Sequence, residues 1–311
     1  MGVGVRGDAS LCRPAPCSEG CFLNRGCRVG RAILLASLCA LALALPAFAQ
    51  GSTAGAVDSN AVRMTETGLG HLLSRREIAF GSAAILATGM LAPLDRPIQR
   101  SLQSEDLQDN RGLRGVGRAF ALAGGPGPFV AGGALYLAGR GTSSPRLAAL
   151  GVHLTEGVVV AAALTGLIKG VSGRALPNAA SAEPGDFSFG RGFHEANGSF
   201  VSFPSGHTAA SFAAAAVVTD EVSRWDSSAA RIVGPVAYSA ATLVALSRLY
   251  QNLHWASDLP IGAAIGVLSG KSVVSWQRRH PENWVDRHLV GLTIAPDGHR
   301  VLVAGSIPVG R

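Results

Sequence analysis

Six apolar segments dominate this 311-residue chain, and each is long enough for a helix of several turns. They cover residues 77–92, 119–139, 146–170, 206–224, 229–249 and 256–277. Prolines punctuate these segments, and because proline lacks a backbone donor and clashes with the preceding turn, it marks helix boundaries. The pattern predicts an all-α fold, a bundle of six helices. The polar stretch 95–118 predicts a short amphipathic helix with turns.

The C-terminal part of the chain has a different sequence pattern. Apolar runs between residues 289 and 306 flank the turn sequence Pro296-Asp297-Gly298, which predicts a short β-hairpin. We therefore expect four parts. They are an N-terminal extension with a signal peptide at 1–49, a flexible lead-in at 50–74, a helical domain at 75–280 and a tail with the hairpin at 281–311.

The N-terminal region is typical of a secretory signal. Arginines precede an uncharged run of 14 residues at 32–45, and Pro46 and Ala47-Phe48-Ala49 follow it. This order predicts cleavage before Gln50. A short membrane anchor is the alternative, but 14 residues are few for a span of about 20. All five cysteines precede the cleavage site, so the mature chain is expected to have no disulfides.

Composition excludes some classes of protein. With 48% hydrophobic and 15% charged residues, the chain is not typical of a disordered protein. The formal net charge is +7, but no dense Lys/Arg run is interleaved with aromatic residues, so no nucleic-acid partner is expected. The 119–138 stretch could span a membrane. Charges interrupt or end several other segments, which would make them poor spans.

The sequence Pro204-Ser205-Gly206-His207 opens an apolar segment. The free N–H groups and the positive dipole end of a helix make an anion site there. His207 lies in the first turn and can reach the same anion. The ordinary alternative is that Pro-Ser-Gly simply starts a helix.

A second pattern joins Ser247-Arg248 to His254 and Asp258. Residues four apart share a helix face, so Asp258 can fix the tautomer of His254 and leave its other nitrogen as a nucleophile or base. A lone helical histidine is more often structural, and Arg248 could be a solvated charge. Two such patterns in one chain, both at helix ends, make coincidence a poor explanation.

A third pattern runs from Lys169 through Gly173-Arg174 to Pro177 at the end of a segment. Arginine can hold two phosphate oxygens at once, while lysine acts as a point charge. Together with Arg248, these cations predict a site for a tetrahedral oxyanion. No cluster of cysteines or carboxylates suggests a metal, so neither metal nor cofactor is expected.

The three patterns resemble those of the type 2 phosphatidic acid phosphatase (PAP2) superfamily, which includes bacterial class A acid phosphatases and vanadium haloperoxidases. The resemblance covers about residues 77–277 and implies a PAP2-like helical bundle. Two motifs match in full, but Leu176 stands where the family's first motif has arginine. The resemblance therefore implies a phosphate site with one cation missing or replaced by Arg174, Arg191 or His194.

The resemblance also implies roles for the site residues. His254 would attack phosphorus and form a phosphohistidine, Asp258 would orient His254, and His207 would protonate the leaving alkoxide. The remaining site residues would bind the phosphate oxygens: Lys169, Arg174, Ser205, Gly206 and Arg248. This implies a metal-independent phosphatase that acts on a lipid phosphate or diphosphate or on a small phosphomonoester. A vanadate-dependent haloperoxidase and a catalytically weak lipid-phosphate-binding envelope protein are the alternatives.

The loop at 178–203 holds five of the eleven phenylalanines. Such a long loop is usually functional. It predicts either a lid that recognises an apolar group beside the phosphate or a small satellite core.

The signal and the family resemblance together place the protein in the cell envelope. We expect an exported, membrane-associated protein of the periplasm or envelope with its site on the non-cytoplasmic side. Six full spans after a signal would put Lys169 on the cytoplasmic side, so we expect some helices not to span.

Overall fold

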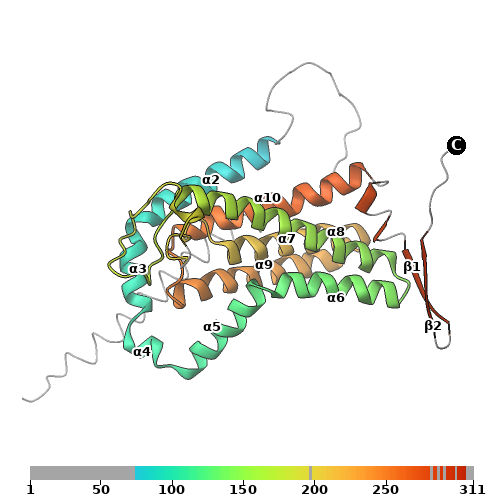
Figure 1. Cartoon of the computed structure of the whole chain (residues 1–311), viewed down its shortest axis with the longest axis horizontal. Coiled ribbons are helices and arrows are strands. Elements are labelled where there is room, and N and C mark those ends of the chain that lie inside the picture. The colour runs from blue at the N-terminus through green and yellow to red at the C-terminus, as the bar shows by residue number, and fades with distance from the viewer. Residues whose placement is uncertain are drawn as a thin grey trace, which may run out of the picture.

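A computed structural model describes residues 74–195, 198–280, 283–285, 288–289, 292–297 and 300–305. The signal peptide predicted at 1–49 lies outside these residues, as does almost all of the lead-in predicted at 50–74. The described chain is helical apart from loops and two strands (Figure 1). The predicted all-α class is therefore confirmed.

The first helices form an arm that reaches one end of the bundle. Helix α2 (Arg75–Leu91) starts at a capping box, in which Ser74 Oγ accepts from Glu77 N and Glu77 accepts from Ser74 N. The arm continues through η2 (Ala92–Leu94), α3 (Asp95–Leu102) and α4 (Glu105–Gln108). These elements bring Asp95 and Ile98 into the interior of the protein, where both are buried.

The prediction of a single helix at 119–139 is wrong. Two helices cover this region, α5 (Arg111–Gly124) and α6 (Gly127–Gly141), and their axes differ by 57°. Gly125 and Pro126 stand at the break, where proline cannot donate to the preceding turn. The six-helix count is wrong for the same reason and because α3 is a separate helix. The described chain has eight helices of eight or more residues.

Four long helices make the core. They are α7 (Pro145–Ser172), α8 (Gly206–Trp225), α9 (Ser227–Tyr250) and α10 (Asp258–Arg279). Helix α8 packs against the other three, and alanines along it allow close approach. One apolar cluster, centred on Phe212, joins α8 to α9 and α10, and another, centred on Val217, joins α8 to α7. Helix α8 is therefore the centre of the bundle.

Glycines let α10 lie against α8. A Cβ on Gly266 would sit 2.3 Å from Ala209 O and 2.9 Å from Ala213 N. Real side chains do not approach backbone so closely, so the spacing of these two helices depends on glycine. Gly133 on α6 has open space where a Cβ would stand.

Four helical segments are long and apolar enough to cross a membrane: Arg75–Leu102, Pro145–Ser172, Ser227–Tyr250 and Asp258–Arg279. A fifth would be the bent pair α5–α6 if both helices form one span. The 119–138 stretch could therefore span only as part of this bent pair, and the expectation that several other segments are poor spans is wrong by length and composition. The polar side chain of His153 on α7 is paired inside the bundle, where its Nδ1 lies 3.0 Å from Oε1 of buried Glu221 on α8. These helices indicate membrane association.

Two strands follow the bundle. The backbone of β1 (Leu292–Asp297) pairs with β2 (Arg300–Gly305) in antiparallel register. Residues 298 and 299, which hold the predicted turn, lie outside the described residues. The hairpin as a whole therefore stays a prediction.

The close contact of α8 and α10 generates a prediction about stability. Gly266→Ala should destabilise the protein by about 1–3 kcal/mol, because the new methyl group must push two helices apart. Gly133→Ala is the matched control and should be neutral or stabilising by up to about 1 kcal/mol, because alanine favours helix and meets nothing. Denaturant unfolding of both variants in the same detergent measures this. Equal stabilities would contradict the packing.

Candidate active site

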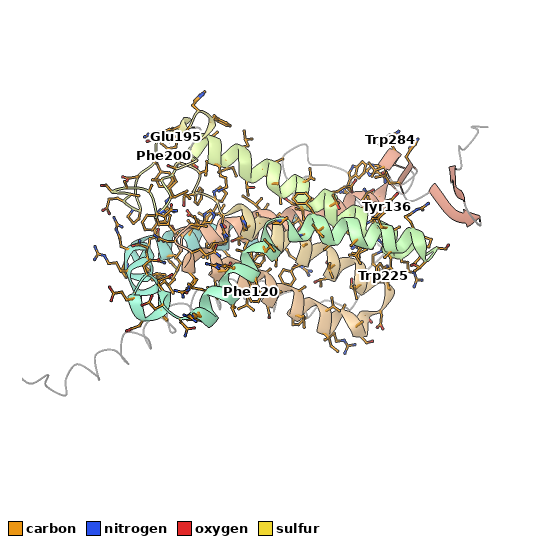
Figure 2. All side chains as sticks on the ribbon, turned by 60° about the horizontal axis from the view of Figure 1, so that its bottom comes forward. Phe120, Tyr136, Glu195, Phe200, Trp225 and Trp284 are labelled. Carbon is orange, nitrogen blue, oxygen red and sulfur yellow. The ribbon has the colours of Figure 1, made fainter. Side chains whose placement is uncertain are left out.

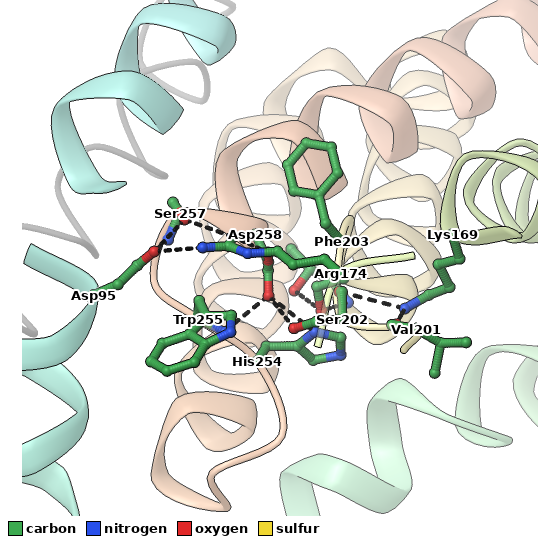
Figure 3. Close-up of polar contacts among 12 residues, drawn as sticks. Asp95, Lys169, Arg174, Val201, Ser202, Phe203, His254, Trp255, Ser257 and Asp258 are labelled. Atoms are coloured by element: carbon green, nitrogen blue, oxygen red, sulfur yellow. Dashed lines mark hydrogen bonds and ion pairs between the residues drawn. The ribbon is translucent and has the colours of Figure 1, made fainter. Parts of the chain in front are cut away.

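The predicted site residues meet at one end of the bundle. Lys169 lies in the last turn of α7, Ser205 and His207 stand at the start of α8, and Arg248 lies in the last turn of α9. His254 and Asp258 come from the short connection into α10 and from its first residue. Figure 3 shows Asp258 among Arg174, Ser202, Trp255 and His254, with Lys169 beside Val201.

The N-terminus of α8 is held rigidly. Ser205 is its N-cap, fully buried, and its Oγ accepts from Thr208 N at 3.4 Å and from Thr208 Oγ1 at 2.8 Å. Ser205 N donates to Asp258 O at 3.2 Å, which ties the start of α8 to the start of α10. A Cβ on Gly206 would lie 3.6 Å from Lys169 Cε, so the lysine passes beside the free amides of the helix end. The geometry is that of a helix end suited to an anion, and anion binding at this place stays a prediction.

Lys169 also holds the loop that precedes α8. Its Nζ donates to Val201 O and lies 3.5 Å from Ser202 O. One ammonium group therefore faces both the loop backbone and the start of α8.

The His254–Asp258 pair forms as the spacing predicted. His254 Nδ1 lies 3.5 Å from Asp258 Oδ2. The contact is long, but it places Nδ1 on the side of the carboxylate, so that Nε2 is the ring nitrogen without this contact. The same Oδ2 accepts from Ser202 Oγ at 2.6 Å and from Trp255 N at 2.8 Å. Asp258 is completely buried and His254 nearly so. With Arg174 Nη1, which donates to Oδ1 at 2.5 Å, the carboxylate is thus oriented by three donors besides the histidine.

Arg248 is buried, and only some of its side-chain nitrogens have hydrogen-bond partners among the described residues. Its Nη1 donates to Gln251 Oε1 at 2.7 Å, and Gln251 Nε2 donates to Gly117 O on α5 at 3.0 Å. Arg248 Nε is buried and has no hydrogen-bond partner among the described residues. Buried donors are nearly always paired, so an oxyanion is a natural partner for this group.

The two histidines are held neutral in the anion-free protein. Burial, followed by the nearby positive groups, lowers the pKa of His207 to about 4. Burial also lowers the pKa of His254, although Asp258 acts in the opposite direction. A neutral His254 has a free nitrogen lone pair. A bound dianion would raise the pKa of His207 and favour its protonated form. The α5–α6 break lies against His207, since a Cβ on Gly125 would stand 3.0 Å from Nε2.

Arg174 is not placed to bind phosphate, which corrects the expectation. Its Nη1 lies 2.5 Å from Asp258 Oδ1, and its Nη2 donates to Asp95 Oδ2 at 2.8 Å and to Pro184 O at 2.6 Å. The remaining Nε donates to Pro184 O at 3.0 Å. The reason is the turn at Gly173, where φ is +53° and a Cβ would collide with Ser188 O. This turn ends α7 and directs Arg174 into the protein.

The suggested replacements for the missing cation also lie elsewhere. Arg191 pairs with Glu195 at 3.0 Å and stacks over Phe200, with its centre 3.7 Å from the ring centroid. His194 is exposed. Leu176 is half-buried, and its backbone N donates to Ser199 O. None of the three suggested residues therefore replaces the arginine that the family pattern has at position 176, and Leu176 keeps an apolar side chain there.

The loop at 178–203 combines a packed part and an exposed part. Ala175, Ala182 and Trp255 form a small buried cluster against which Phe200 packs, so a satellite core is present. Phe189 and Phe193 are exposed, at 82% and 55%. Figure 2 shows Glu195 and Phe200 at this end of the bundle and Trp225 at the other. A lid role for the exposed phenylalanines stays a prediction.

Three polar residues of the site were missed by sequence reasoning: Asp95, Ser202 and Ser257. Asp95 had a weak signal, because it stands between Pro93 and Pro97 at the start of the polar stretch, but its partners are distant in sequence. No group of three or more His, Cys, Asp and Glu side chains could hold a metal ion within the part of the chain that the structure describes.

Residues 150–282 match the model of the PAP2 superfamily. A 90-residue stretch is 40% identical to the lipid A 1-phosphatase of Porphyromonas gingivalis. The match covers 28% of this chain and 18% of that protein, so it spans less than a fifth of the relative. No solved structure matches the chain.

The low pKa of His207 generates a prediction about anion binding. Sulfate should bind more weakly as the pH rises above about 4, because its binding raises the pKa of His207 and takes up a proton. Between the free and bound pKa values the affinity should fall by up to about tenfold per pH unit. Sulfate itself stays a dianion over this range. Calorimetry with His207→Gln as the control measures this, and an equal slope in that variant would contradict the assignment.

Proposed function

We propose that this chain is a metal-independent phosphatase that releases phosphate from a lipid phosphate through a phosphohistidine on His254. The observation that carries the proposal is the pairing of buried His254 with Asp258 opposite His207, beside two cations and the free amides of a helix end. This arrangement provides a nucleophile, an acid and positive charge around one tetrahedral group.

In the first step, the neutral Nε2 of His254 attacks phosphorus. The bond from phosphorus to the leaving alkoxide oxygen breaks, and this oxygen takes the proton from His207. The ring of His254 gains positive charge, which the Asp258 carboxylate stabilises. Lys169, Arg248 and the amide of Gly206 bind the non-bridging oxygens. Phosphoryl transfer depends mainly on such positioning and charge stabilisation.

In the second step, a water molecule attacks the phosphorus of the phosphohistidine. His207 now accepts a proton from this water, the bond from phosphorus to Nε2 breaks, and inorganic phosphate leaves. His254 returns to its neutral form. The same two histidines thus serve both steps with opposite proton transfers.

The depth of the site supports a lipid substrate. Lys169 and Arg248 lie within three residues of the ends of two candidate spans, and Asp258 is the first residue of a third. The end of a span lies at the level of lipid head groups. The relative whose name is lipid A 1-phosphatase favours the same substrate class. The signal-like N-terminus and the family resemblance favour a site on the non-cytoplasmic side of the membrane.

The proposal predicts metal-independent phosphate release. In EDTA, the purified full chain in detergent should release phosphate from lipid A and from phosphatidic acid faster than from p-nitrophenyl phosphate. His254→Ala should abolish release, a loss of at least about 1,000-fold. A 32P-labelled substrate should leave an acid-labile, base-stable label on the wild-type chain alone. Release that persists in His254→Ala, or that needs a divalent metal, would refute the mechanism.

Leu176 favours a second candidate, a protein that binds lipid phosphate with little turnover. If the missing cation limits catalysis, Leu176→Arg should raise kcat/KM by about tenfold or more, because it adds a donor for the transition-state charge. Leu176→Met keeps an apolar side chain of similar volume and should change little. Phosphate release by the three proteins measures this. A wild-type chain that binds vesicles with phosphatidic acid but releases no phosphate would support the binding protein.

A further inference from the structure

Asp95 connects the N-terminal arm to the site. It opens α3, which lies before the residues that match the PAP2 superfamily, and its side chain is fully buried. Its Oδ1 accepts from Ser257 N at 2.9 Å, and its Oδ2 accepts from Ser257 Oγ at 2.6 Å. A carboxylate from outside the matched region therefore holds the residue that precedes Asp258.

Arg174 joins two buried carboxylates. One end of its guanidinium lies 2.5 Å from Asp258 Oδ1, and the other lies 2.8 Å from Asp95 Oδ2. All three side chains are at most 4% exposed. Figure 3 shows Asp95, Arg174 and Asp258 in one continuous row of contacts, with His254 at the Asp258 end. Asp95 and His254 also line the same narrow crevice beside Trp255.

The charges in this row do not cancel. Burial raises the pKa of Asp95, while its hydrogen bonds from Ser257 and the charge of Arg174 act in the opposite direction. With both carboxylates ionised, two carboxylates and one guanidinium leave one net negative charge in the row that ends at His254. With Asp95 neutral, the guanidinium would balance Asp258 alone, and the net charge would be zero. Because water screens buried charges poorly, a change of one charge in this row should alter the pKa of His254.

His254 needs that negative charge. The other groups that face it carry positive charge or can acquire it: Lys169 from α7, His207 from α8 and Arg248 from α9. In the proposed reaction the ring of His254 becomes cationic among them. Only the Asp258 carboxylate opposes this repulsion from nearby.

We propose that Asp95 is a positioning residue for the reaction. By sharing Arg174 with Asp258, it preserves the net negative charge beside His254 and fixes the Asp258 carboxylate against the ring. This rests on the proposed function for its catalytic consequence, but the charge balance can be measured without turnover.

The test compares three substitutions by their effect on the pKa of His254. Asp95→Asn keeps the shape and removes one negative charge, so the pKa should fall by about one unit. Arg174→Met removes the positive charge and should raise it. The double variant restores the net charge of the wild type and should return the pKa towards the wild-type value. Titration by 15N NMR of labelled histidines, with saturating sulfate to stabilise the cationic rings, measures all four proteins.

Glu221→Gln is the matched control. It removes a buried carboxylate paired with a histidine at the other end of the bundle, so it carries a similar folding cost. It should leave the pKa of His254 and the rate of phosphohistidine formation unchanged. Asp95→Asn should slow that rate by about tenfold, with the Kd for sulfate within about threefold of the wild type.

The outcomes separate this inference from the proposed function. An unchanged pKa in Asp95→Asn, or an equal shift in Glu221→Gln, would overturn the charge sharing. An Asp95→Asn protein that no longer binds sulfate would overturn it in favour of a purely structural role. If the wild-type chain releases no phosphate, the proposed function fails. The comparison of the His254 pKa among the four proteins then still decides whether Asp95 sets the net charge beside His254.

Discussion

The burial of the Asp258 carboxylate is the constraint on which the rest of the site depends. A buried charge is costly unless it is paired and hydrogen-bonded. Its partners come from separate parts of the chain: Arg174 after α7, Ser202 from the long loop, and Trp255 and His254 from the connection into α10. Satisfying this one group therefore fixes the end of α7, the loop and the start of α10 relative to one another. The same contacts orient the histidine, so the stability of this region and its chemistry share one network.

Local patterns predicted the parts of the site that depend on local geometry. The i, i+4 spacing of His254 and Asp258 and the capped start of α8 at Ser205 are properties of a few consecutive residues, and the structure brings them together as expected. Asp95 could not be found in this way, because its partner Ser257 lies 162 residues away. The α5–α6 break had a local signal in Gly125 and Pro126, but the apolar content of the stretch outweighed it in the interpretation. The number of helices was wrong for that reason.

Arg174 shows why residue type and spacing do not define a role. Two positions separate it from Leu176, where the family pattern has a phosphate-binding arginine. The positive φ of Gly173 ends α7 and turns the chain so that Arg174 enters the protein instead of the pocket. The guanidinium then meets two carboxylates, which a linear motif cannot reveal. A cation that seems to replace the missing ligand is in fact committed to orienting Asp258.

The position of the candidate site at the helix ends fits the proposed lipid substrate. The interior between α8 and α10 is built from alanine and glycine contacts, which let the helices pack closely and leave polar groups for the ends. Lys169, Arg248 and Asp258 stand where three candidate spans end, so a phosphate at head-group depth can reach them without leaving its lipid in water. Exposed Phe189 and Phe193 flank the same end and present apolar surface beside the cations. A soluble phosphoester would need neither feature, so the position of these residues at the helix ends supports the proposed lipid substrate more specifically than their charge does.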